Sequence, residues 1–468
     1  MPFDENIQGD PFRGDFPGRA EHQPWDELEA GLPRQITELA QRRFQPAIRH
    51  QLSQLQRRRR EPDSGQPASV TQFDILPAGV GPDTLLARGE ILITGRDYDG
   101  RPGAAGGRPD RTAKAFLDVL GMQAAEVGCA ELEGRVVRLT HHDMEPEELS
   151  DVVKALRARG FAASVSNIIP TGPVAKAIGG PLPIDPAGPY EPDAGPGAAA
   201  KVAVIDTGIA AEIRADGWLS RVPRDAGNTD PLRVFPLSAP DDPLDLDAGH
   251  GTFVSGIVQQ IAPGAEITVY RAVDSDGIAS EVTVACEMIR AVQAGAEIIN
   301  LSLGCQTQEN LPPIAIQAAL DVIGELEHGE GREVIIVAAA GNYGDTAPCW
   351  PAAFRRVVSV AALAPDMLPA AWSSRGFWVD CSTIGQGLRS TYVEGEESVL
   401  VDPEQHRFGP GAWAAWSGTS FAVPQIVGAL ARLHEKHEYP LREALVRLLS
   451  AGRPMPDFGR ALKILPGI

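Results

Sequence analysis

The distribution of hydrophobic positions along the chain changes at about residue 200. Beyond it, short and almost uninterrupted apolar runs alternate with longer segments in which apolar residues recur at helical spacing. Uninterrupted apolar strands are typical of a parallel sheet that is buried on both faces. Strands are predicted at 202–205, 266–272, 297–303, 334–339 and 357–361, and the main helices at 250–260, 280–293 and 312–327. The alternation predicts an α/β domain with a doubly wound, mostly parallel sheet over residues 198–468.

The region before it has a different order of elements. Its pattern predicts strands at 90–95, 124–132, 135–139 and 162–169, with helices at 112–120 and 146–159. The order β-α-β-β-α-β predicts an α+β, ferredoxin-like domain over residues 88–170. Residues 171–197 are rich in Pro and Gly, which predicts a flexible or extended linker.

Residues 1–87 are predicted to be a polar, partly helical extension. Between 25 and 60, apolar residues recur at steps of three to five, which indicates one or two amphipathic helices. Four arginines at 57–60 end this segment. They could contact nucleic acid or a membrane, but the pattern favours a solvated helix end, where the helix dipole stabilises cations.

Composition narrows the class of protein. The chain has 468 residues, long enough for two or three domains, and a net charge of −20, which argues against a nucleic-acid partner. Its first residues do not resemble a signal peptide and no long apolar run predicts a membrane span. Five scattered cysteines without a C-x-x-C pair favour reduced thiols over a disulfide framework, and hence a cytoplasmic location.

Three local clusters suggest ligand binding, and each has a simpler explanation. The glycine-rich stretch 100–107 lacks the G-K-[ST] ending of a phosphate-binding loop, so a surface loop is favoured. His141, His142 and Asp143 could bind a metal, but they fit a connection between a strand and a helix. The acids in 274–277 could bind calcium, but a turn beside a cleft is favoured. No metal site is therefore assigned.

Three other segments each place a residue of a type used in catalysis at the end of a predicted strand or the start of a predicted helix. Asp206 ends a buried strand, where open α/β sheets build their sites. His250 lies between two glycines at the start of a helix. Ser420 lies at the beginning of another helix, where free N–H groups favour negative charge. Each of these residues alone has a structural explanation, such as a helix cap.

Together they match a nucleophile, a general base and an orienting acid. A weak hydroxyl nucleophile needs such a base, and the base needs the acid. The order acid, histidine, serine is the one found in subtilisin. Asn342 follows another predicted strand in V-A-A-A-G-N, and its amide can donate to an oxyanion together with the Ser420 backbone N–H.

Residues from about 200 to 437 resemble the subtilase family of serine peptidases. The matching motifs are AVIDTGI, HGTFVSGIVQQIAPGAEI, AVDSDG, IINLSLG, VAAAGN and SGTSFAVP. The resemblance implies a serine endopeptidase that hydrolyses protein or peptide substrates through an acyl-enzyme on Ser420, without a cofactor, although calcium is common in the family. In that scheme His250 transfers the proton and Asp206 orients the imidazole.

The resemblance also implies a cleft that holds an extended peptide by main-chain pairing. One wall would consist of Ser302, Leu303 and Gly304, and the other of Gly277, Ile278 and Ala279. Ala340 and Gly341 would bound the first specificity pocket, opposite the turn at 349–351. Cys349 would lie at its floor, as an inert buried thiol in preference to a redox switch.

Two segments depart from the family pattern. Phe253 stands where a second histidine is common, and S-F-A-V-P-Q replaces the more usual S-M-A-x-P-H. Neither change removes a catalytic group. A catalytically silent scaffold that binds peptides is the alternative function, and an α/β-hydrolase esterase is excluded because G-x-S-x-G and its residue order are missing.

Many subtilases carry an inhibitory propeptide with the β-α-β-β-α-β order. Residues 88–170 resemble that module, so the N-terminal domain is predicted to inhibit its own catalytic domain, with cleavage between about 169 and 197. A permanent accessory domain is the alternative.

Overall fold

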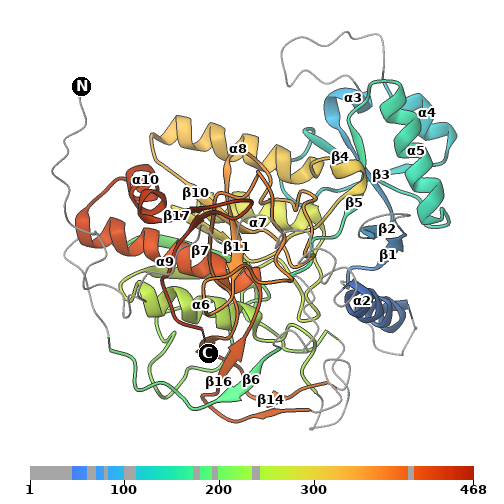
Figure 1. Ribbon diagram of the computed structural model, residues 1–468. Helices are drawn as coiled ribbons and strands as arrows, with labels where there is room; N and C mark the ends of the chain where they lie inside the picture. Colours follow the sequence, from blue (N-terminus) through green and yellow to red (C-terminus); the bar gives the residue numbers. More distant parts are fainter. Residues whose placement is uncertain are drawn as a thin grey trace, which may run out of the picture.

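A parallel sheet forms the centre of the computed structural model, which describes residues 45–60, 70–77, 83–99, 112–171, 180–191, 199–234, 243–398 and 405–467. The sheet has eight strands in the order β17-β18-β12-β11-β10-β9-β7-β8 (Figure 1). Their bounds are β7 Lys201–Asp206, β8 Glu266–Arg271, β9 Ile298–Leu301, β10 Ile335–Ala339, β11 Val357–Leu363, β12 Cys381–Ile384, β17 Arg453–Met455 and β18 Gly459–Ala461. All the pairs from β8 to β18 are parallel, as the sequence predicts.

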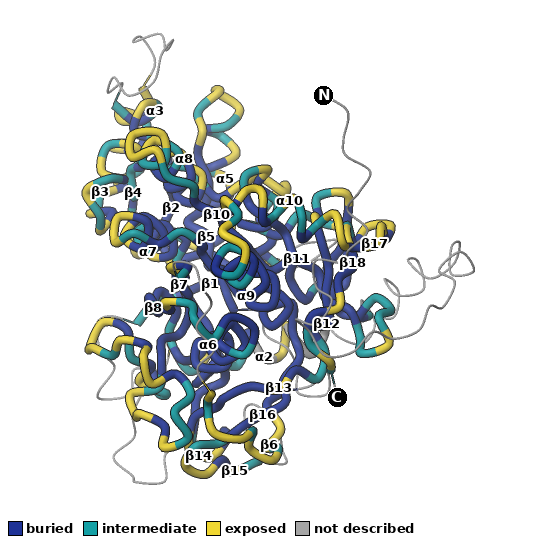
Figure 2. The backbone as a smooth tube through the Cα atoms, turned by 90° about the vertical axis from the view of Figure 1, so that its left-hand side faces the viewer, coloured by how far each residue is buried: buried dark blue, intermediate teal, exposed yellow. Residues whose placement is uncertain are grey.

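Helices cover both faces of this sheet. Alternate residues of β7 point to opposite faces: Val202 and Val204 belong to one core, Ala203 and Ile205 to the other. The first core is covered by α6 (His250–Ile261) and α9 (Thr419–His437), and the second by α7 (Glu281–Gln293) and α8 (Ile314–Glu330). In Figure 2 the central strands β10, β11 and β12 are dark blue, that is, buried. Apolar burial on both sides explains why the strands are almost uninterrupted apolar runs.

Smaller elements complete the larger part of the structure, from residue 199 to 467, which contains the predicted catalytic residues and is called the catalytic part below. They are the 3-10 helix Gln308–Asn310, α10 (Leu441–Ala451), β13 (Leu388–Thr391), β14 (Gly395–Glu396), β15 (Arg407–Phe408) and β16 (Trp413–Trp416). β6 (Leu182–Ile184) pairs antiparallel with β16. The prediction of a linker throughout 171–197 is therefore wrong for 182–184, because this segment adds a strand to a sheet of the catalytic part. Residues 172–179 and 192–197 of the predicted linker lie outside the described residues.

The N-terminal part contains the predicted six elements in the predicted order. They are β2 (Thr84–Thr94), α4 (Lys114–Val119), β3 (Gln123–Ala125), β4 (Val136–Thr140), α5 (Pro146–Ala158) and β5 (Ala163–Asn167), with the short helix α3 (Gly95–Asp99) after β2. The strands lie in the order β5-β2-β4-β3, and every pair is antiparallel. β3 is shorter than the predicted 124–132, because the chain turns at Gly128 with positive φ.

The predicted N-terminal extension also contributes to this sheet. β1 (Phe73–Leu76) pairs antiparallel with the first residues of β2, and α2 (Gln45–Arg60) follows the predicted helical pattern. The rest of that pattern, from 25 to 44, and the glycine-rich stretch 100–107 lie outside the described residues. His141 and His142 lie between β4 and α5, at the predicted connection.

The N-terminal sheet packs against α7 and α8, on one side of the catalytic part (Figure 1). Leu92, Val136 and Ile169 share a hydrophobic core with residues of those two helices. A disulfide bond between Cys129 and Cys286 also joins the two parts. The prediction that all five cysteines are reduced is wrong for this pair, since the fold brings together two residues 157 positions apart. The argument for a cytoplasmic location loses that support.

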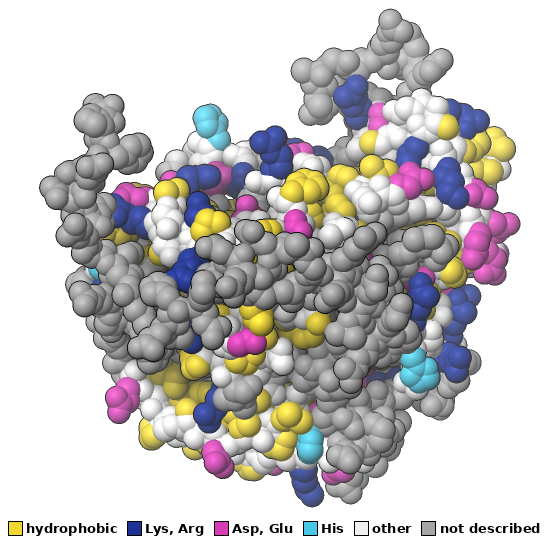
Figure 3. Space-filling model, in the orientation of Figure 1, with side chains coloured by type: hydrophobic (Ala, Val, Ile, Leu, Met, Phe, Trp, Pro, Cys, Tyr) yellow, Lys and Arg dark blue, Asp and Glu magenta, His cyan; other side chains and the backbone are white. Residues whose placement is uncertain are grey.

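The surface carries both signs of charge. On the face seen in Figure 3, the Lys and Arg side chains that the structure describes are interspersed with Asp and Glu side chains. Among the described residues, no helix has the length and apolar composition to cross a membrane.

Candidate active site

Asp206 and His250 form a direct hydrogen-bonded pair. Asp206 is the last residue of β7 and His250 the first of α6, and His250 Nδ1 lies 2.7 Å from Asp206 Oδ1. Both side chains are buried. The Thr207 backbone N–H donates to the same Oδ1 over 2.8 Å, which fixes the carboxylate. The imidazole is thereby held with Nδ1 against the acid and Nε2 available to a nucleophile.

Burial lowers the pKa of His250, but nearby acids outweigh this effect. The Asp206 charge and its hydrogen bond, followed by the charges of Asp247 and Asp230, raise the pKa of His250 above its usual value. Negative charges around an imidazole stabilise its protonated form. The surroundings of His250 therefore favour the imidazolium that forms when it accepts a proton.

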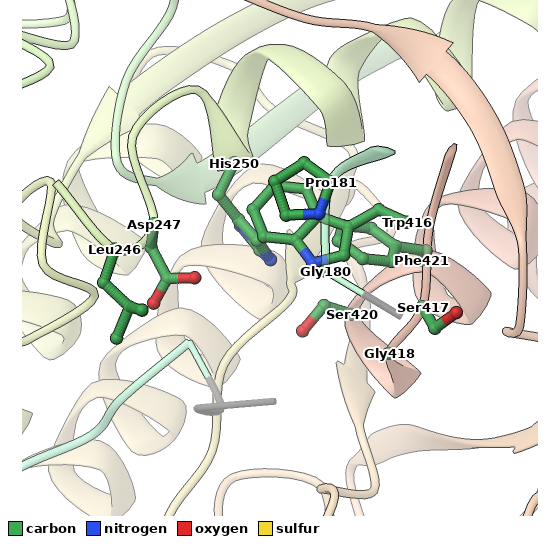
Figure 4. Close-up of a pocket in the computed structure, with 10 residues that line it drawn as sticks. All are labelled: Gly180, Pro181, Leu246, Asp247, His250, Trp416, Ser417, Gly418, Ser420 and Phe421. Atoms are coloured by element: carbon green, nitrogen blue, oxygen red, sulfur yellow. The ribbon is translucent and has the colours of Figure 1, made fainter. Parts of the chain in front are cut away.

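Ser420 lies in the same pocket as His250, but no hydrogen bond joins the two among the described residues. Ser420 is the second residue of α9, and its hydroxyl faces the carbonyl oxygens of Thr171 at 2.9 Å and Ser302 at 3.1 Å. Figure 4 shows His250 and Ser420 lining one pocket, which Gly180, Pro181 and Trp416 also line. The Ser420 hydroxyl must rotate before it can donate to His250.

Asn342 presents an amide donor close to Ser420. Its Oδ1 accepts hydrogen bonds from the backbone N–H of Thr419 at 3.0 Å and from the Thr419 hydroxyl at 2.9 Å. Because a backbone N–H can only donate, the atom facing it must be the oxygen, and the NH₂ group points the other way. Among the described residues, no acceptor forms a hydrogen bond with that NH₂ group. A donor that is to stabilise an oxyanion must be free in this way.

The two predicted walls of the cleft enclose residues 168–171 of the same chain. Ile168 forms an antiparallel bridge with Ser280, the Ile169 N–H donates to Ala279 O at 2.8 Å, and the Thr171 N–H donates to Gly277 O at 3.1 Å. From the opposite wall, the Gly304 N–H donates to Pro170 O at 2.9 Å. This is main-chain pairing of an extended peptide from both sides.

The chain is similar in sequence to known proteins. The model of the subtilase family, Peptidase_S8, matches residues 197–450. The chain belongs to the subtilase family. Two relatives are the thermophilic serine proteinase of Bacillus sp. (strain AK1), 31% identical over 44% of this chain and 47% of its own, and thermitase of Thermoactinomyces vulgaris, 28% identical over 50% of this chain and 75% of its own. The chain thus spans about half the length of the first relative.

One solved structure resembles the fold of this chain over more residues than the family model matches. Fervidolysin from Fervidobacterium pennivorans, a keratinolytic enzyme related to subtilisin, matches with a TM-score of 0.54 at 20% identity, over 85% of this chain and 63% of its own. The matched share exceeds the segment of the family model, so the likeness includes residues before 197. At this identity it concerns the fold alone.

The two departures of this subtilase from the family pattern meet behind the histidine. Phe253 and Phe421 pack with ring centroids 4.6 Å apart, and Trp416 stacks edge-on against His250 at 5.5 Å. Phe421 also lies 5.2 Å from the imidazole. The larger aromatic residues therefore form an apolar backing that excludes water from one side of His250.

Cys349 Sγ lies against both Gly304 and Gly341, at the predicted first specificity pocket. A Cβ atom built on Gly304 would lie 2.7 Å from Cys349 Sγ, and one on Gly341 would lie 2.9 Å from it. Ala340 and Leu303 are fully buried beside these glycines. Burial raises the pKa of the Cys349 thiol, which fits the predicted inert packing residue.

Two acids that the motifs did not single out organise the histidine loop. Asp230 is buried and accepts hydrogen bonds from the Thr207 hydroxyl, the Ser275 hydroxyl and the Gly249 N–H, and so ties the segment after Asp206 to the segment before His250. Asp247, three residues before His250, accepts from the Thr171 hydroxyl at 2.7 Å. For Asp247, its place three residues before His250 is a sequence signal, whereas Asp230 lies 20 residues from His250 and has none.

Two arginines at the end of α2 bind the cleft wall of this subtilase. Arg59 is 1% exposed and pairs with Asp274 at 2.8 Å and Asp276 at 3.1 Å, and Arg58 pairs with Asp245 at 2.8 Å. The prediction of a solvated helix end is therefore wrong for Arg58 and Arg59, while Arg57 and Arg60 are exposed as predicted. The arginines compensate acids that the fold buries next to Gly277.

The acids at 274–276 form the predicted turn beside the cleft. Asp274 Oδ1 accepts from the N–H groups of Asp276 and Ile278, while its other oxygen faces Arg59. Within the described ranges, no group of three or more His, Cys, Asp or Glu side chains could hold a metal ion.

Proposed function

We propose that this subtilase is a serine endopeptidase that cleaves protein or peptide substrates and is made as a self-inhibited precursor. The observation that supports it most is the residue set around Ser420: a hydrogen-bonded Asp206–His250 pair, the Asn342 amide donor, and two walls that bind an extended chain. A nucleophile, a base and an oxyanion donor are the three requirements of acyl transfer.

The chemistry follows from the roles of these groups. Ser420 Oγ attacks the carbonyl carbon of the scissile peptide while His250 Nε2 takes the hydroxyl proton. Negative charge on the carbonyl oxygen is stabilised by the Asn342 amide and the Ser420 N–H. The C–N bond breaks as His250 returns the proton to the leaving amine. A water molecule then attacks the ester by the same route, releasing the acid and regenerating Ser420.

Self-inhibition is supported by the segment that fills the cleft. Residues 168–171 pair with both walls, and the Thr171 carbonyl accepts the Ser420 hydroxyl. Among the described residues, neither Asn342 Nδ2 nor the Ser420 N–H donates to the Thr171 oxygen, so this carbonyl lies outside the oxyanion donors. The contact therefore blocks the nucleophile without presenting Thr171 for attack. Cleavage is expected C-terminal to Thr171, within the range up to 197.

A fluorophosphonate probe tests this function. We expect the probe to label Ser420 slowly in the intact chain, and faster after limited proteolysis between 171 and 180 followed by reduction of the Cys129–Cys286 bond. A Ser420→Ala chain should not be labelled and should keep its full length after reduction. Absence of labelling after proteolysis and reduction, with the fold intact by circular dichroism, would support the peptide-binding scaffold instead. A wild-type chain that also keeps its full length after reduction would refute self-cleavage.

A further inference from the structure

The side chain of Thr171 makes a specific contact inside the cleft. Its hydroxyl donates to Asp247 Oδ2 over 2.7 Å, and both residues are buried. Of the cleft segment, this side chain makes the only hydrogen bond to a carboxyl group of a wall among the described residues. Burial raises the pKa of Asp247 to about 7, so the bond is charge-assisted above that pH. Removal of the donor then leaves a buried carboxylate unpaired.

The wall is shaped to admit this side chain. Gly277 has a φ of +81°, and a Cβ atom there would lie 2.0 Å from Asp247 Oδ2 and 2.4 Å from Thr171 Oγ1. A side chain at 277 would thus occupy the space in which the hydroxyl and the carboxylate meet. The Gly277 carbonyl meanwhile holds the Thr171 N–H, so the backbone is aligned and the side chain faces Asp247.

Asp247 is fixed independently of the cleft segment. Its N–H donates to Ser275 O at 2.9 Å, and its carbonyl oxygen accepts from the His250 N–H at 3.0 Å. Its carboxylate, in contrast to that of Asp230, has no side-chain or backbone donor other than Thr171 within the described part of the chain. When residues 168–171 leave the cleft, a fixed carboxylate remains that lacks a donor and faces the substrate backbone.

We propose that Asp247 determines specificity by selecting a hydroxyl-bearing side chain, Thr or Ser, at the substrate position that Thr171 occupies. The inference rests on the proposed peptidase function and adds a substrate class to it. The class is extended peptides whose side-chain hydroxyl is placed against Asp247 when the backbone pairs with the two walls. Valine has the shape of threonine without the donor, so it leaves the carboxylate unpaired. The discrimination between Thr and Val should be about 10- to 100-fold.

The first test uses the intact chain and needs no catalysis. In a Ser420→Ala background, hydrogen exchange of the N–H groups of residues 169 and 171 reports how firmly the cleft holds its segment. Thr171→Val should accelerate this exchange about 10- to 100-fold, whereas Thr171→Ser should leave it within a few-fold. Asp247→Ala should have an effect similar to that of Thr171→Val, and the two changes combined should add little. Additive effects, or no effect of Thr171→Val, would overturn the inference.

The second test measures specificity in the active enzyme. Peptides that contain Ile-Ile-Pro-Thr-Gly, Ile-Ile-Pro-Val-Gly or Ile-Ile-Pro-Lys-Gly before the same reporter group are compared by kcat/KM; the glycine, which follows Thr171 in the chain, keeps the varied residue one position before the scissile bond. We expect Thr to exceed Val by about 10- to 100-fold, and Asp247→Ala to abolish that ratio even if it lowers every rate. A preference for Lys over Thr, or a ratio unchanged in Asp247→Ala, would overturn the inference. No hydrolysis of any peptide would instead refute the proposed function, and the exchange test would still decide the contact.

Discussion

Ser420 Oγ lies 2.9 Å from the carbonyl oxygen of Thr171, a residue 249 positions earlier in the chain. The nucleophile is thus hydrogen-bonded to its own N-terminal part, and among the described residues the His250 ring forms a hydrogen bond with Asp206 only. Inhibition of this kind requires no distortion of the site. It requires only that the segment stays in the cleft.

Asn342→Ala should lower kcat by about 10²–10³, with little change in KM. The Asn342 amide is aimed by its two bonds from Thr419, and its free donor would contact the substrate only when negative charge develops on the carbonyl oxygen. Steady-state kinetics on one peptide substrate measures both constants. Loss confined to KM would show that Asn342 binds the ground state and does not stabilise the oxyanion.

Arg59→Met should reduce the free energy of unfolding by about 3–5 kcal/mol, because it leaves Asp276 buried without this partner. The neighbouring Arg57 is exposed, so Arg57→Met is the matched control and should change stability by less than about 0.5 kcal/mol. Urea unfolding followed by tryptophan fluorescence compares the two. Equal stabilities would mean that α2 does not hold the cleft wall.

The stability of the chain should fall as pH rises from about 4.5 to 7, in part through Glu281. Its carboxylate accepts from the N–H and Nδ2 of Asn167 and from the Ala315 N–H, but burial outweighs these bonds and raises its pKa to about 7. The folded state therefore binds more protons than the unfolded state in this window, which makes unfolding easier as pH rises.

Glu281→Gln should remove roughly 3 kcal/mol of this decline across the window. Glu325→Gln, an exposed change at the same contact between the two parts, is the control and should leave the slope as it is. Urea unfolding at a series of pH values measures the slopes. An identical slope in wild type and Glu281→Gln would contradict the assignment.

Limited proteolysis between 171 and 180 should yield one band on a non-reducing gel and two on a reducing gel, because Cys129 and Cys286 join the pieces. Cys129→Ser should yield two bands under both conditions. Two bands from the wild type without reductant would show that the pair is not bonded.

The sequence could predict the fold where the signal is local or belongs to a motif. Strands such as β7 are recognisable because their burial on both faces requires apolar residues, and Asp206, His250 and Ser420 are recognisable because each lies in a family motif. The amphipathic spacing of residues such as Leu52 and Leu55 likewise revealed α2.

What the sequence could not predict are pairings that tertiary structure alone creates. Arg59 meets Asp274 across 215 positions, and Thr171 meets Asp247 across 76. A run of arginines has the same composition whether it is solvated or paired. Likewise, a Pro-rich stretch gives no sign that 182–184 finds a free strand edge at β16.

The Cys129–Cys286 bond also changes how inhibition should depend on protein concentration. A propeptide that is cut free is diluted into the solution, and its occupancy of the cleft then depends on the protein concentration. Here a cut would leave the inhibitor tethered next to its binding site, at an effective concentration on the order of millimolar whatever the dilution. Activity after cleavage should therefore be independent of enzyme concentration, and a thiol reductant, not dilution, should be what releases it.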